Sequence, residues 1–190
     1  MRTRILHRAA AATLAVTAGP CMAHGFAGSG WVHPLTGIDH MLAMIAVGLW
    51  SAQLGSRALA GVPAAFVVAM AFGSIAGLSQ WPLPGIEALV AASVLILGAA
   101  ILARTRLAWP LAAAAALVFG LAHGYAHGLE MPVTGRLEYA AGFLVTTAAL
   151  HVIGAASGLL LLDQPAGGRW LRGGGALVAA VGLVLLGSAA

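Results

Sequence analysis

The sequence predicts an all-α, polytopic membrane protein with six transmembrane helices after a cleavable signal peptide. Of its 190 residues, 61% are hydrophobic and only 7% are charged, whereas about a quarter of the residues in a soluble domain carry charge. Six apolar stretches follow one another, each close to the ~20 residues that a bilayer-spanning helix requires. We predict these spans at residues 33–54, 58–78, 86–103, 108–128, 137–162 and 173–189.

The N-terminal segment has the pattern of a secretory signal. It starts with three arginines, continues with a short alanine-rich stretch, and ends at Cys21-Met22-Ala23, which resembles a small-residue cleavage site. Cleavage after Ala23 would make residues 1–23 the signal and residues 24–190 one transmembrane domain, with an uncleaved anchor as the alternative. Because the single cysteine lies in the signal, a cleaved chain would have no thiolate ligand for a metal.

Arginine is distributed unequally among the predicted loops. The second and fourth loops carry only Arg136, whereas the first, third and fifth carry Arg57, Arg104, Arg106, Arg169 and Arg172. Because positively charged loops stay cytoplasmic, we expect a bacterial inner-membrane protein whose mature N-terminus and C-terminus are both periplasmic. No run of basic residues is present, which argues against a nucleic-acid partner.

The segment FGLAHGYAHGLE, residues 119–130, places ionisable side chains in an apolar span. His123 and His127 are four residues apart, and Glu130 follows three residues later, so the three share one face of a helix. Two imidazoles and a carboxylate on one face are suitable ligands for nickel, cobalt or zinc. This segment is therefore the first candidate for a metal site.

A second polar segment, HPLTGIDH, begins the first span. On a regular helix His33, His40 and Met44 form one stripe, and Asp39 lies about 100° from His40, where it either binds on a neighbouring face or orients that imidazole. In the predicted topology His40 and His123 each lie about 10 Å below the periplasmic surface. We therefore expect the two segments to surround one divalent metal ion, the alternative being a structural hydrogen-bond network between the spans.

Four other residues are weaker candidates. His151 lies about 21 Å along the fifth span, as an inner metal stop, a proton acceptor or a hydrogen-bonding partner of another helix. Glu87 either gathers cations at the entrance or is a solvated carboxylate. His24 would offer a chelating amine and imidazole after cleavage, and Met44 offers a thioether that either binds metal or only packs.

Glycines spaced four residues apart predict closely packed helices. The spacing occurs on the second, fourth and fifth spans, at Gly73/Gly77, Gly120/Gly124/Gly128 and Gly154/Gly158.

The two polar segments resemble the signature motifs of the HupE/UreJ family of nickel permeases. Residues 33–40 match a motif of His, five residues and Asp-His, and residues 123–130 match HGx[A/V]HGxE, with Ala122 where the family usually has Phe. The resemblance covers the whole chain and implies uptake of nickel, or cobalt in some members, for hydrogenase or urease maturation. It also implies that the metal is handled by His33, Asp39, His40, His123, His127 and Glu130.

The favoured hypothesis is a secondary transporter or permease rather than an enzyme, because the sequence has no ATP-binding motif. Its partners would be membrane lipid and the divalent ion as substrate, without a resident cofactor, and an oligomer is compatible with this interpretation. One alternative is an intramembrane zinc-dependent hydrolase with Glu130 as general base. Another is a di-haem cytochrome with His40, His123, His127 and His151 as axial ligands.

Overall fold

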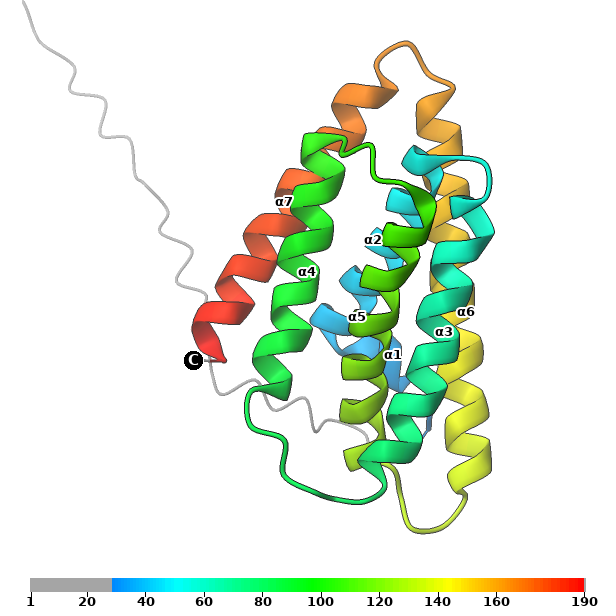
Figure 1. The fold of residues 1–190 in the computed structure, drawn as a ribbon, viewed down its shortest axis with the longest axis vertical. Coiled ribbons are helices and arrows are strands. Elements are labelled where there is room, and N and C mark those ends of the chain that lie inside the picture. Colours follow the sequence, from blue (N-terminus) through cyan, green and yellow to red (C-terminus); the bar gives the residue numbers. More distant parts are fainter. Residues whose placement is uncertain (1–28, 190) are drawn as a thin grey trace, which may run out of the picture.

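The computed structural model describes residues 29–189, which form an elongated bundle of helices (Figure 1). The predicted signal peptide and His24 lie outside these residues. The described residues contain seven helices and no strand, so the all-α prediction is confirmed. The helices are α1 (His33–Thr36), α2 (Ile38–Leu54), α3 (Ala58–Gly77), α4 (Ile86–Ala103), α5 (Trp109–Leu129), α6 (Arg136–Leu162) and α7 (Gly167–Ser188).

Five helices, α3 to α7, are long and apolar enough to cross a membrane. Helix α2 is also apolar but has only 17 residues, and the short helix α1 precedes it. The prediction of a multi-pass membrane protein is confirmed, whereas the count of six spans stays a prediction.

The prediction of one regular helix over residues 33–54 is wrong, because the helix is interrupted at Gly37. The backbone of Gly37 is extended, with φ −82° and ψ 112°, and it separates the single turn of α1 from α2. The Asp39 carboxylate then accepts the backbone N–H of His40 at 2.8 Å, which satisfies one of the free N–H groups at the start of α2. The predicted stripe of His33, His40 and Met44 along a continuous helix is therefore also wrong.

The predicted start of the last span, residue 173, is wrong by six residues, because α7 begins at Gly167. The run of glycines at residues 173–175 lies inside this helix. A side chain at Gly175 would overlap the backbone of Leu102 and the carbonyl oxygen of Gly98 on α4. The glycine thus permits close contact between α7 and α4.

The helices form three closely packed pairs, α3 with α5, α2 with α6 and α4 with α7. Helices α3 and α5 approach so closely that a Cβ atom at Gly73 would overlap the Leu121 carbonyl, and one at Gly124 would overlap the Met70 carbonyl. The same holds for Gly154 of α6 against Ile45 of α2. The predicted role of these glycines in close helix packing is confirmed.

One end of the bundle collects the polar motifs. Helix α1, the first turn of α4 and the last turn of α5 lie at the lower end in Figure 1. The connections from α2 to α3, α4 to α5 and α6 to α7 lie at the upper end. The fold thus brings the two motif segments to the same end of the bundle, although they are about 90 residues apart in sequence.

Candidate functional site

Four imidazoles from the two motif segments are in mutual contact. The ring centroid of His127 lies 4.8 Å from that of His33 and 4.7 Å from that of His40. His40 is also 5.0 Å from His123. His123 and His127 are completely buried. The structure therefore brings together all four histidines that the two motifs contain, and we call His33, His40, His123 and His127 the imidazole cluster.

Two imidazoles of this cluster, those of His40 and His33, each contact a carboxylate at hydrogen-bond distance. Oδ1 of Asp39 lies 2.8 Å from Nδ1 of His40, and Oε2 of Glu130 lies 2.8 Å from Nε2 of His33. Because a carboxylate accepts, Nδ1 of His40 carries the proton and Nε2 keeps its lone pair. Of the two arrangements that the sequence allows for Asp39, the structure has the one in which it orients His40.

Buried nitrogen atoms with free lone pairs remain at the centre of the imidazole cluster. Nδ1 of His123 donates to the Phe119 carbonyl at 2.9 Å, which leaves its Nε2 as an acceptor. Nε2 of His40, Nε2 of His123 and both nitrogens of His127 are buried without a hydrogen-bond partner among the described residues. Leaving such a group unsatisfied costs about 1–3 kcal/mol. The alternative of a structural hydrogen-bond network is formed only in part: the His33–Glu130 contact links the two segments, whereas these four nitrogen atoms have no partner among the described residues.

The rings nevertheless do not form a closed coordination sphere. Within residues 29–189 no three His, Cys, Asp or Glu side chains have a geometry that would hold a metal ion. The imidazoles pack edge to face, with interplanar angles of 68° to 77°, rather than aiming their nitrogens at one point. Binding a cation here would therefore require some of the rings to rotate.

Aromatic side chains surround the imidazole cluster. His127 stacks on Phe143, with centroids 4.7 Å apart and planes within 3°. Phe66 lies 5.3 Å from His123, and Tyr139 lies 5.9 Å from His33. Sequence reasoning missed these three residues, because an aromatic residue in an apolar helix has the same pattern whether it fills the core or lines a site.

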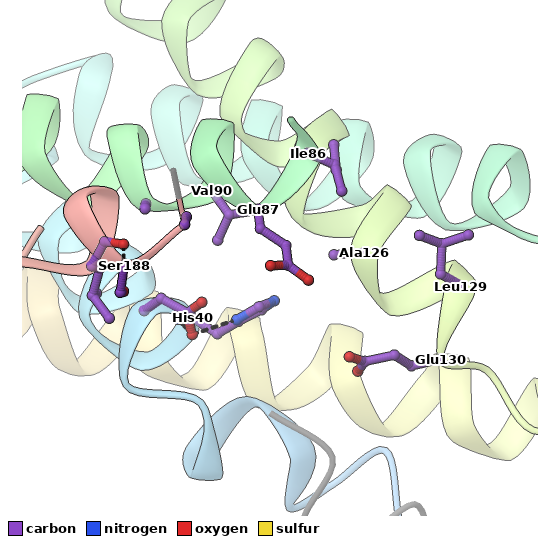
Figure 2. A pocket seen from close by; sticks show the side chains of 12 residues that line it. His40, Ile86, Glu87, Val90, Ala126, Leu129, Glu130 and Ser188 are labelled. Atoms are coloured by element: carbon purple, nitrogen blue, oxygen red, sulfur yellow. Dashed lines mark hydrogen bonds and ion pairs between the residues drawn. The ribbon is translucent and has the colours of Figure 1, made fainter. Parts of the chain in front are cut away.

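A cavity of about 330 Å³ opens beside His40 and is lined by three carboxylates. Asp39 and His40 come from α2, Glu87 from the first turn of α4 and Glu130 from the end of α5. Figure 2 shows the side chains of His40, Glu87 and Glu130 directed into the same space. We call this cavity the acidic vestibule. His40 lines it and also contacts His123 and His127, so it connects the vestibule with the buried rings.

His151 and Met44 lie deeper in the bundle. His151 is only 1% exposed, and neither of its ring nitrogens has a hydrogen-bond partner in the described chain. The hydrogen bond to another helix that the sequence allowed is therefore not formed. Met44 is completely buried, and its sulfur accepts a hydrogen bond from the Thr147 hydroxyl at 3.2 Å.

Comparison with known proteins gives one consistent result. A family model described as HupE / UreJ protein matches residues 5–185 of the chain. The chain is also 38% identical over 182 residues to Protein HupE of Rhizobium leguminosarum bv. viciae. This alignment covers 92% of this chain and 95% of that relative. No solved structure gives a significant match.

Proposed function

Because the chain belongs to the HupE/UreJ family, we propose that it is a secondary transporter or permease that takes up Ni²⁺ across the bacterial inner membrane. Cobalt is a second candidate substrate, and the metal would serve hydrogenase or urease maturation. The observation that carries this proposal is the set of buried, unpartnered nitrogens on His40, His123 and His127. Imidazole is a good ligand for nickel and cobalt, and a passing cation would provide the partner that these atoms lack.

The proposed path begins at the acidic vestibule. Carboxylates of Asp39, Glu87 and Glu130 raise the local concentration of divalent cations, and His40 at the inner wall passes an ion to the buried rings. The proposed metal-handling residues are those of the two motifs: His33, Asp39, His40, His123, His127 and Glu130. Two of these carboxylates also hold imidazoles, so their negative charge acts both on the ion and on its ligands.

The open geometry of the imidazole cluster suits a transported ion better than a resident one. Conduction requires binding that is favourable enough for entry and weak enough for release. Rings that must rotate to coordinate the metal provide such intermediate binding, because part of the binding free energy is used in reorganisation. A closed site with every nitrogen already aimed at one point would retain its ion.

The proposed orientation places the imidazole cluster near the periplasmic side. The arginine-containing loops at the opposite end of the bundle would face the cytoplasm, as the positive-inside rule requires. An ion with two charges that moves inward then gains about 4.6 kcal/mol per 100 mV of membrane potential. Uptake would therefore need no nucleotide hydrolysis.

The alternative functions are less compatible with the geometry. A zinc hydrolase would need Glu130 as a free general base, whereas this carboxylate is paired with His33 at 2.8 Å. In a di-haem protein each axial imidazole needs a porphyrin face, whereas the rings of His40, His123 and His127 pack directly on one another. The transport proposal requires neither a free Glu130 carboxylate nor porphyrins inserted between the rings.

The test is uptake of ⁶³Ni into liposomes that contain the purified protein and an imposed inside-negative potential. His127→Ala and Asp39→Ala should each reduce the initial rate to that of empty liposomes, while the amount of inserted protein stays unchanged. The first variant removes a buried ligand, and the second removes the carboxylate that orients His40. Normal nickel uptake by either variant would contradict the proposed site, and no uptake by the wild-type protein would contradict the proposed function.

A further inference from the structure

A second imidazole environment lies behind the ring of Phe66. The Phe66 centroid is 5.3 Å from that of His123 and 5.1 Å from that of His151, so this one ring contacts both. The ring of His151 stands perpendicular to it, at 89°. Phe66 on α3 therefore lies in contact with the innermost ring of the imidazole cluster on one side and with His151 on α6 on another.

Two further potential donor atoms belong to Thr147 on α6 and to Met44 on α2, which is in contact with Thr147. Thr147 is one helical turn before His151 on α6, and its hydroxyl donates to the Met44 sulfur at 3.2 Å. Thr147 and Met44 are both completely buried. An imidazole, a hydroxyl and a thioether thus occupy neighbouring turns of this helix pair. Nitrogen and sulfur donors without a carboxylate favour late first-row metals over magnesium or calcium.

The backbones around His151 are held close together. A Cβ atom at Gly48 of α2 would overlap the carbonyl oxygen of His151, and one at Gly154 of α6 would overlap that of Ile45. The helices are therefore in contact here, and the two unpartnered nitrogens of His151 are enclosed within the protein. Their environment is fixed by the α2–α6 packing rather than by a flexible loop.

An apolar groove on the outer face of the bundle adjoins His151. It has a volume of about 410 Å³, lies between α3 and α6, and is lined by His151 together with Leu59, Pro63 and Ala155. Leu59 lies in the first turn of α3, and Ala155 is one turn beyond His151 in the direction of the α6 C-terminus. The groove opens to the outside of this helix pair, because Ala60, Ala64 and Val152 in its wall are exposed.

We propose that His151, with Met44 and Thr147, forms a second, inner binding site for the transported divalent cation, which an ion reaches when Phe66 moves aside. This inference rests on the proposed transport function and adds a second binding site to the proposed path; we call it the inner station. The outer cluster combines imidazoles with carboxylates, whereas the inner station has only neutral donors. The inner station therefore binds a divalent cation more weakly, which favours onward release.

The first test is equilibrium binding of Ni²⁺ to purified, tag-free protein in lipid nanodiscs. His151→Gln should bind one ion fewer than the wild-type protein, and its rate of ⁶³Ni uptake into liposomes should fall at least tenfold. His127→Ala should lose a different ion, so the double variant should lose both. Unchanged stoichiometry in His151→Gln would overturn the inner site, whereas absence of uptake by the wild-type protein would instead overturn the transport function.

The second test does not depend on the folding of a histidine variant. X-ray absorption of the nickel-loaded protein should show a sulfur neighbour, and Met44→Leu should remove it. Met41→Leu is the matched control, because Met41 is on the same helix but the hydrogen bond of Thr147 goes to the sulfur of Met44. If the wild-type protein gave no nickel–sulfur signal, Met44 would not be a ligand. The same conclusion would follow if the signal persisted in Met44→Leu.

Discussion

The two faces of α5 have opposite chemistry and serve different purposes. Gly120 and Gly124 contact α3 backbone to backbone, so that a single Cβ atom at either position would overlap the Phe66 or Met70 carbonyl. His123 and His127 leave the same helix on another face and meet imidazoles from α1 and α2. One face therefore fixes the helix in the bundle, and the other presents groups that can bind a ligand.

This difference shows how a rigid scaffold can support a site whose ligands move. Helices α2 and α5 meet at few residues, chiefly through the imidazole rings, whereas α3 and α5 are in contact along their length. The imidazole cluster therefore meets α5 on a different face from the one whose glycines pack on α3. Sites on rigid elements keep their ligands within reach of one another. Here the close glycine contact between α3 and α5 provides that rigidity.

The largest effect is expected from Gly124→Leu, which places a large side chain on the glycine face of α5, the face that carries Gly120 and Gly124. The new side chain would meet the Met70 backbone, which cannot move aside as a flexible side chain would, so α3 and α5 must separate. Overpacking in a core costs about 1–3 kcal/mol or more, and we expect loss of folded protein from the membrane fraction. Size-exclusion chromatography of the solubilised protein measures this loss.

Gly187→Leu is the matched control for this substitution. A Cβ atom at Gly187 of α7 has open space around it, so the same change should leave yield and elution volume unaltered. If Gly124→Leu also eluted as a single folded species at wild-type yield, the glycine face would not be the scaffold that we describe.

The fold was predictable from sequence where composition and length decide the structure. The apolar stretches identified the ends of α3 to α6 to within one residue, because few conformations other than helices satisfy the backbone in a membrane. The break at Gly37 and the early start of α7 were not predictable. The break at Gly37 is accompanied by a local hydrogen bond between the adjacent residues Asp39 and His40, which hydropathy does not report, and the length of α7 depends on the close approach of Gly175 to α4.

The candidate site was predictable in its histidines but not in its surroundings. Spacing on a helix identified His123 and His127, and matching depths related them to His40, which they contact. The pairing of Glu130 with His33 and the stacking of Phe143 on His127 depend on how separate helices are rotated. Hydrophobic periodicity carries little information on rotation when nearly every residue of a helix is apolar.

A smaller effect is expected from Glu130→Gln, which alters the imidazole face without removing a ring. Glutamine keeps the size of the side chain and a hydrogen bond to His33 but removes the negative charge beside it. Loss of such a supporting carboxylate typically reduces metal affinity about 10- to 100-fold. The KM for ⁶³Ni uptake should therefore rise, with little change in the amount of inserted protein.

A titration of uptake rate against nickel concentration measures this effect. If the KM of Glu130→Gln equalled that of the wild-type protein, the His33–Glu130 pair would have no part in metal handling. If the protein instead disappeared from the membrane, the pair would belong to the scaffold, and the division between the two faces of α5 would need revision.

The smallest effect is expected from Glu87→Gln, because Glu87 lies on α4 and reaches the site only through the acidic vestibule. It makes no ion pair in the described structure, so the contribution that we propose for it is the attraction of cations to the entrance. Such steering changes association rates and weakens as salt is added. We expect about tenfold slower uptake at low nickel and low ionic strength, with recovery when nickel is saturating.

Glu138→Gln provides a control of equal charge. Glu138 lies in the first turn of α6 at the same end of the bundle, but it lines a separate small cavity with Trp31 and Thr134. Removing its charge should leave nickel uptake unchanged under the same conditions. Equal losses in the two variants would mean that only the total negative charge at this end matters, and the vestibule would then have no specific role in delivering the ion to His40.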